Sequence, residues 1–119
     1  MSGVFNTIQI GFAWEQELTL AEGMIAAGDG LRADFRYAVD DDDPLFAIAS
    51  AGNGIVIEGL SVTLSLTPQR TAAIAPPEAG KEWRTVLCDL VRLPEGGGEE
   101  HLGFRLHIPA ALPVTRASA

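Results

Sequence analysis

Apolar and polar residues alternate with period two along several stretches, and this pattern constrains the fold more than any other feature. In LRADFRYAV, residues 31–39, apolar side chains occupy every second position, and Arg32, Asp34 and Arg36 fall between them. The segments SVTLSLT, residues 61–67, and HLGFRLHI, residues 101–108, repeat the alternation. Because successive side chains of a β-strand point to opposite faces, each stretch predicts a strand of an antiparallel sheet with one buried and one solvated face.

Shorter segments with weaker alternation add further candidate strands. They are residues 7–13, 16–21, 45–49 and 54–58. The segment WRTVLCDLVRL, residues 83–93, is apolar on both faces, which indicates either a central strand or a strand interrupted by a bulge. We therefore expect about eight strands, joined by turns at the spacing of β-sandwiches and barrels.

One short helical turn is predicted within LTPQRTAAIAPP, residues 66–77. Thr67 can cap it, Pro68 suits the first helical position, and Pro76 with Pro77 prevents its continuation. Elsewhere the connections look like hairpins, including a two-residue link at Glu58 and Gly59. The chain has no internal repeat and no composition break, so residues 1–119 are predicted to form a single antiparallel β-sandwich domain.

Charge and composition disfavour several classes of partner. The net charge of −8 repels nucleic acid and anionic lipid, while a hydrophobic share of 47% is ordinary for a folded domain. No apolar run reaches the length of about 20 residues needed to span a bilayer. The chain has a single cysteine, and its first residues show neither the basic region nor the apolar stretch of an export signal. We therefore expect a protein that is cytoplasmic when synthesised.

Four consecutive aspartates (Asp40, Asp41, Asp42 and Asp43) are the most conspicuous candidate for a metal site. A calcium loop needs spaced oxygen ligands and a glycine at its sixth position, whereas counting from Asp40 places Pro44 fifth, Leu45 sixth and Ala51 twelfth. Adjacent aspartates of an extended chain also point to alternate sides. The cluster is therefore interpreted as the solvated tip of a hairpin.

The remaining polar candidates do not form a catalytic set. Six residues of strand separate His101 from His107, about 20 Å, which is too far for one shared ion. Both histidines are expected on the solvated face. Ser61 and Ser65 belong to the polar face of a strand and lack a nucleophile elbow, and the glycines of GNGIVI and EGGGEE precede no helix that could receive a phosphate. We predict no catalytic, cofactor-binding or metal-binding residues and no enzyme activity.

The two tryptophans and the cysteine are open to two interpretations. Trp14 and Trp83 could form a platform for a sugar, but their neighbours alternate as in a strand, which favours a place in the core for both. Cys88 is expected to be a small buried hydrophobe without a basic neighbour that would activate its thiol.

From residue 31 onward the order of elements resembles a known family, the immunoglobulin-like β-sandwich domains of tailed-phage and prophage structural proteins. It is similar to the amino-terminal domain of baseplate upper proteins. The segment LSVTLSLTPQRTAAI resembles the family's alternating strand followed by a threonine-capped helical turn. The later likeness lies at Trp83, the Asp89–Leu90 pair, Gly103 and the terminal VTR, residues 114–116.

This resemblance implies an immunoglobulin-like sandwich that serves as a non-catalytic component of a tail, baseplate or related particle. It implies partners among other virion proteins, a possible homo-oligomer, and a final location in the virion. The carboxy-terminal segment, about residues 112–119, is expected to be a flexible tail that could make subunit contacts. The alternative is a β-sandwich module that binds a carbohydrate or a protein.

Overall fold

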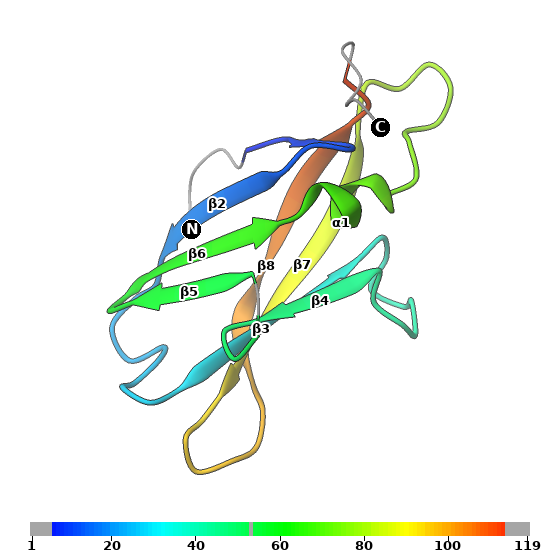
Figure 1. The fold of residues 1–119 in the computed structure, drawn as a ribbon. Helices are drawn as coiled ribbons and strands as arrows, with labels where there is room; N and C mark the ends of the chain where they lie inside the picture. Colours follow the sequence, from blue (N-terminus) through cyan, green and yellow to red (C-terminus); the bar gives the residue numbers. More distant parts are fainter. Residues whose placement is uncertain (1–5, 53, 114–119) are drawn as a thin grey trace.

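A computed structural model describes residues 6–52 and 54–113. In these residues the chain forms two β-sheets and one short helix (Figure 1). The elements are β1 (Ile8–Gln9), β2 (Trp14–Thr19), β3 (Gly30–Arg36), β4 (Phe46–Ala49), β5 (Ile55–Glu58), β6 (Ser61–Leu66), α1 (Pro68–Ala72), β7 (Arg84–Leu93) and β8 (Glu100–Ala111). The predicted all-β character is therefore confirmed.

The strands divide into a larger and a smaller sheet that face each other. The five-stranded sheet has the order β1-β8-β7-β3-β4, and the three-stranded sheet has the order β2-β6-β5. Among the described strands, every strand-to-strand pairing is antiparallel except that of β1 with β8, which is parallel, with Ile8 opposite Ala110. The expectation of a uniformly antiparallel arrangement is thus wrong at this edge. An isolated parallel bridge also joins Ala49 and Gly54.

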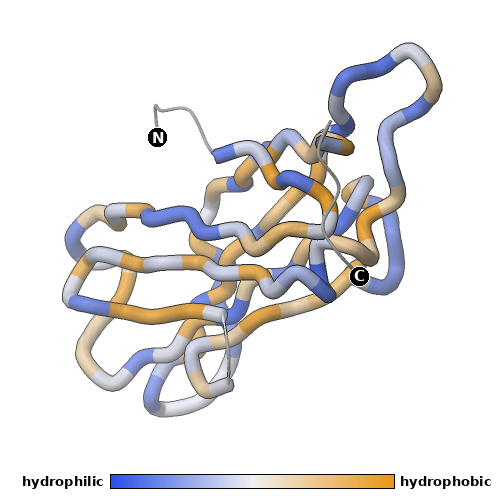
Figure 2. The backbone as a smooth tube through the Cα atoms, turned by 45° about the horizontal axis from the view of Figure 1, so that its top comes forward, coloured by the Kyte–Doolittle hydropathy of each residue, from blue (hydrophilic) through white to orange (hydrophobic). Residues whose placement is uncertain are grey.

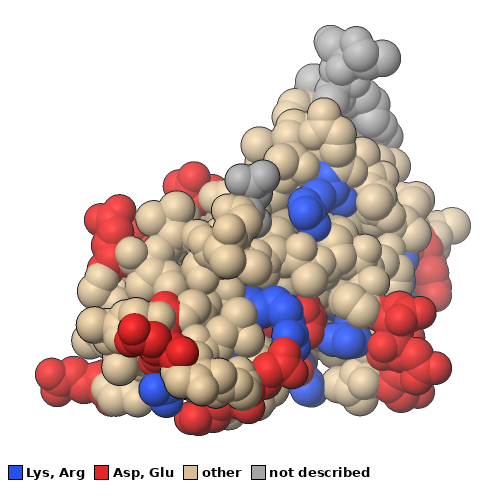
Figure 3. All heavy atoms as spheres, turned by 60° about the horizontal axis from the view of Figure 1, so that its bottom comes forward, with Lys and Arg blue, Asp and Glu red and all other residues tan. Residues whose placement is uncertain are grey.

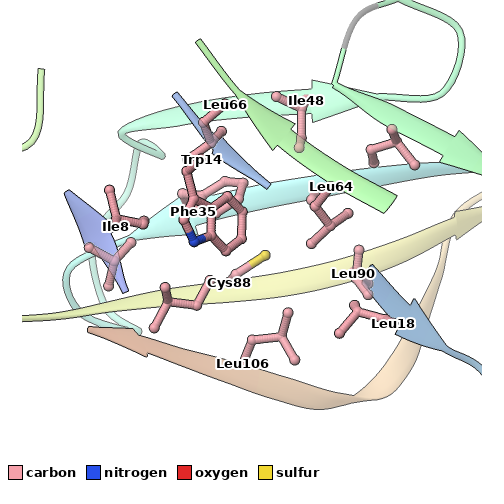
Figure 4. Close-up of a cluster of buried hydrophobic side chains, with 14 of the residues drawn as sticks. Ile8, Trp14, Leu18, Phe35, Ile48, Leu64, Leu66, Cys88, Leu90 and Leu106 are labelled. Atoms are coloured by element: carbon pink, nitrogen blue, oxygen red, sulfur yellow. The ribbon is translucent and has the colours of Figure 1, made fainter. Parts of the chain in front are cut away.

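Alternating inward side chains of both sheets form one hydrophobic core between the layers (Figure 4). Phe35 of β3 is fully buried, and its ring lies edge-on to Trp14 of β2 with 6.4 Å between the ring centroids. Phe46 of β4 packs on the same ring with a centroid distance of 5.0 Å. Full burial of a side chain such as Phe35 stabilises the folded state by roughly 1.5–3 kcal/mol, and its contact with Trp14 holds the two sheets together.

Strand β7 shows why the segment at residues 83–93 is apolar on both faces. It is a central strand, paired with β3 on one side and with β8 on the other. Its register with β8 shifts between Asp89 and Val91, and both Leu90 and Val91 are buried. The sequence allowed a central strand or a bulge, and the structure has both.

Helix α1 begins and ends as predicted. The Thr67 hydroxyl accepts a hydrogen bond from the Arg70 backbone N–H at 3.2 Å, Pro68 occupies the first helical turn, and Ile74 is buried. Thr71 adds a link that the sequence did not indicate. Its buried hydroxyl donates to the Phe12 carbonyl at 2.8 Å and accepts from the Gly11 N–H at 3.0 Å, so α1 is fastened to the turn that precedes β2.

Several predicted boundaries are wrong by a few residues. Strand β3 ends at Arg36, and Val39, expected on the buried face, is 64% exposed. The strand expected at residues 7–13 contains only the two residues of β1. The two-residue turn expected at Glu58 and Gly59 instead comprises Gly59 and Leu60, because Glu58 still pairs with Ser61. Gly59 has a positive φ of 64°, which such a tight turn requires. Of the predicted tail, residues 114–119 lie outside the described residues.

Candidate functional site

The connection from α1 to β7, residues 73–83, projects from one end of the sandwich (Figures 1 and 2). We call it the α1–β7 loop. Trp83, its last residue, is 57% exposed, whereas Trp14 is only 5% exposed. The prediction of a core position is confirmed for Trp14 and wrong for Trp83. Strand pairing begins at Arg84, so the side chain of Trp83 is not directed inward by the sheet.

Both ends of the α1–β7 loop are fixed to the sandwich around Tyr37. The Ala75 N–H donates to the Tyr37 hydroxyl at 2.8 Å, and the Arg84 guanidinium lies 3.7 Å from the centroid of the Tyr37 ring. Arg84 also donates through Nη1 to the Ala75 carbonyl at 3.3 Å. These contacts hold the position of Trp83, although the middle of the loop extends into solvent.

The loop itself forms a shallow hollow of about 620 Å³. It is lined by Glu78, Gly80, Lys81, Glu82, Trp83 and Arg84. An exposed indole beside charged side chains is the composition of many binding sites for polypeptides, and also of sugar platforms, because the ring offers a large apolar face at low entropic cost. This hollow with Trp83 is the first candidate contact site.

A second hollow, of about 480 Å³, lies at the opposite end of the sandwich, between the β2–β3 connection and the β5–β6 turn. We call it the end hollow. Its apolar lining consists of Ile25, Ala26, Ala27, Ile57 and Leu60, and Gly28, Asp29 and Gly59 complete it. These residues come from two segments about 30 positions apart, so no local sequence pattern identifies the hollow.

Asp29 shapes one wall of the end hollow. Its carboxylate accepts hydrogen bonds from the Ala26 N–H at 2.8 Å, from the Arg92 Nε at 2.6 Å and from the Glu95 N–H at 3.2 Å. These partners, the backbone N–H of Ala26 first and the Arg92 side chain next, lower the pKa of the Asp29 carboxyl below its ordinary value. Since the side chain is only 4% exposed and its acceptor positions are occupied, Asp29 supports the hollow and is not a free ligand group.

The outer face of the five-stranded sheet carries a network of ion pairs. Asp89 of β7 receives two hydrogen bonds from Arg105 of β8, at 2.8 and 3.1 Å, and the Arg105 partner lowers the pKa of the Asp89 carboxyl. Asp34 lies directly opposite Asp89 in the sheet and pairs with Arg32, whose guanidinium also contacts Glu99. The charges on this face largely neutralise one another, so it offers little for a charged ligand.

His101 extends the network but does not form a catalytic pair. Its Nδ1 accepts a hydrogen bond from the Gly103 N–H at 2.8 Å, and its Nε2 lies 3.3 Å from a carboxylate oxygen of Asp89. This arrangement fixes the tautomer with the proton on Nε2. His107, which is also exposed, faces Leu87 across the strands. No serine or cysteine is among the hydrogen-bond partners of His101 in the part of the chain that the structure describes.

The other residues singled out in the sequence do not meet at one site. Residues 40–43 lie exposed in the β3–β4 connection, where the Asp41 carboxylate accepts a hydrogen bond from the Ala38 N–H at 3.1 Å. Cys88 is buried, and burial raises the pKa of its thiol well above the ordinary value. Ser61 and Ser65 lie on the outer side of β6. In residues 6–52 and 54–113, no three His, Cys, Asp or Glu side chains gather where they could hold a metal ion.

Charge is distributed unevenly over the molecule (Figure 3). With the lower end of Figure 1 turned forward, acidic side chains lie around the margin of the visible face, and basic ones lie between them. One carboxylate, that of Glu95, belongs to the region of the end hollow, because it occupies the space next to Gly28.

Comparison with known proteins adds no assignment, since no protein-family model and no curated protein sequence matches the chain. Within the described residues, no helix is long and apolar enough to cross a membrane.

Proposed function

We propose that this protein is a non-catalytic assembly subunit of a phage or prophage tail, baseplate or related particle. The observation that carries the proposal is Trp83, a large aromatic side chain 57% exposed and held at one end of the sandwich by the Tyr37 and Arg84 contacts. Tryptophan is enriched among the residues that dominate protein interfaces. A partner that covers Trp83 would therefore gain the burial of a large aromatic ring.

The strand order supports the immunoglobulin-like part of the proposal. An immunoglobulin sandwich places strands B, E and D in one sheet and G, F and C, followed by C′ in variable types, in the other. The orders β2-β6-β5 and β8-β7-β3-β4 have the same sequence of connections if β2 is strand B. In this correspondence β1 is the first strand of the sandwich, and it pairs with the last strand, β8.

The resemblance of residues 31–116 to phage structural domains supports the choice of particle. The described residues form ion pairs and a core and no convergent acid, base and nucleophile, which suits a role in assembly without catalysis. Such a subunit would be made in the cytoplasm and then incorporated in the virion, with other virion proteins or its own copies as partners.

Capture from cells with an induced prophage tests the assembly role. The purified tagged protein is compared with Trp83→Ser and with Val56→Ser, a control that removes an apolar side chain 55% exposed on the other sheet. We expect mass spectrometry to find tail or baseplate proteins with the parent and the Val56 variant, and at least tenfold less with the Trp83 variant. Absence of virion proteins from every capture would refute the role.

A sugar-binding module is the second candidate, because Trp83 borders the 620 Å³ hollow with the carboxylates of Glu78 and Glu82. Titration with simple and polymeric sugars distinguishes it. A saturable shift in tryptophan emission that disappears in Trp83→Ser would favour this candidate, since Trp14 is buried and remains as an internal reference.

A further inference from the structure

The two ends of the sandwich carry an exposed apolar side chain and an apolar hollow, respectively. Trp83 precedes Arg84, which pairs with Ala110 at one end of β7. At the other end of β7, Leu93 pairs with Gly30, which follows the residues of the end hollow. Ten residues of strand separate these ends by about 30 Å, so Trp83 cannot enter the end hollow of its own chain.

The end hollow has a suitable size and chemistry for an indole ring. Its volume of about 480 Å³ lies within the range of roughly 300–1,000 Å³ that is usual for ligand sites. Five of the residues that line it are apolar, and the Asp29 carboxylate is already bound by Ala26, Arg92 and Glu95. An apolar occupant therefore leaves this carboxylate with its three partners.

Charge at the two ends is complementary as well. The Glu95 carboxylate occupies the space next to Gly28 of the end hollow and so places negative charge beside it. Trp83 lines its hollow together with two cationic side chains, Lys81 and Arg84, and two carboxylates, Glu78 and Glu82. A second copy that presents Trp83 to the hollow can bring Lys81 towards Glu95, whereas two end hollows that face each other would bring two Glu95 carboxylates together.

We propose that Trp83 of one copy inserts into the end hollow of a second copy, so that the chains associate head to tail. This inference deepens the assembly role proposed above and rests on it. Two different surfaces meet in such a contact, so each end of the growing oligomer keeps a free tryptophan or a free hollow. The oligomer therefore either closes into a ring or extends as a filament. A contact of this size is weak between two chains and strengthens when several form together.

Sedimentation of purified protein at up to about 1 mM tests the contact. Trp83→Ser removes the inserted ring, Ala27→Arg blocks the hollow with a long charged side chain, and Val56→Ser is the surface control. The parent and the Val56 variant should self-associate. Trp83→Ser and Ala27→Arg should each associate at least tenfold more weakly and remain monomeric.

An equal mixture of Trp83→Ser and Ala27→Arg provides the decisive measurement. The first variant keeps an intact hollow and the second keeps an intact tryptophan, so together they should form a dimer that grows no further. Dimer formation also shows that both variants are folded. A contact between two identical surfaces would not be restored in this way.

Three results would overturn the proposal: a parent protein that stays monomeric over the whole range, a Trp83 variant that associates like the parent, or a mixture that forms no dimer although both variants melt like the parent. A monomeric parent that still captures virion proteins would overturn the head-to-tail contact and leave the assembly role standing. Association that depends on Trp83, without any captured virion protein, would support the contact and overturn the assignment to a particle.

Discussion

Asp29 joins two segments that are distant in the sequence, its own β2–β3 connection and the end of β7 with the turn that follows it. It accepts hydrogen bonds from the β2–β3 connection, from Arg92 near the end of β7, and from the β7–β8 turn at Glu95. The Arg92 guanidinium also pairs with Glu100 at 3.5 Å, so the start of β8 belongs to the same cluster. The Asp29 carboxylate thus holds together the chain segments at the end of the sandwich that contains the end hollow.

Replacement of Asp29 by asparagine should lower the melting temperature at pH 7 by several degrees, because Arg92 loses the closer of its two carboxylate partners and keeps only Glu100. The folded carboxyl has a pKa below its ordinary value, so the unfolded chain binds more protons in acid. The parent's advantage should therefore be complete at neutral pH and decline as the pH falls below about 4.

Thermal melts of the parent and of Asp29→Asn from pH 7 to acid provide the measurement. Glu95→Gln is the matched control, because it neutralises a neighbouring carboxylate but keeps the Glu95 N–H that binds Asp29. A difference in melting temperature between parent and Asp29→Asn that does not change with pH would contradict the interpretation.

At the scale of elements, the sequence predicted the long strands well and the short ones poorly. Alternation located β3, β6 and β8 because one face of each is buried along most of its length. It could not show that β3 ends at Arg36, since Tyr37 and Val39 continue the pattern after the pairing with β7 has ended. It also could not show that β1 lies parallel to β8, because that partner is about 100 residues away.

The cap of α1 provides a test at the scale of an element. Thr67→Ala should reduce the free energy of unfolding by about 1 kcal/mol, because the Arg70 N–H loses its acceptor. Thr67→Ser retains a hydroxyl and should lose much less. Urea unfolding of the three proteins measures the effect, and identical midpoints would mean that α1 does not contribute through its cap.

At the scale of the whole molecule, the candidate contact sites arise where the fold brings distant segments together. Tryptophan at position 83 was visible in the sequence as a candidate, but only the start of β7 at Arg84 decides that it is exposed. The end hollow depends on residues 25–29 and 57–60 lying side by side, which follows from the packing of two sheets and not from either segment. Sequence reasoning therefore identified one half of the proposed contact and missed the other.

The α1–β7 loop should be independent of the rest of the fold, so that cutting it leaves the sandwich intact. Lys81 is the only lysine of the chain and lies exposed in this loop, so a lysine-specific protease should cut the native protein there at one site. The second fragment contains β7 and β8, and β7 pairs with β3 while β8 pairs with β1. The two fragments should therefore stay together, because those pairings and the core between the sheets remain intact.

Native chromatography should show the nicked protein eluting as one species, and denaturing gels should show two fragments. Its β-type circular dichroism should persist, with a melting temperature only slightly below that of the uncut protein, whereas Lys81→Arg should resist the protease. A lysine that is cut only after unfolding would mean that the loop packs against the sandwich, and fragments that separate on cutting would mean that the loop is required for the fold. Either result would contradict the independence of the α1–β7 loop from the rest of the fold.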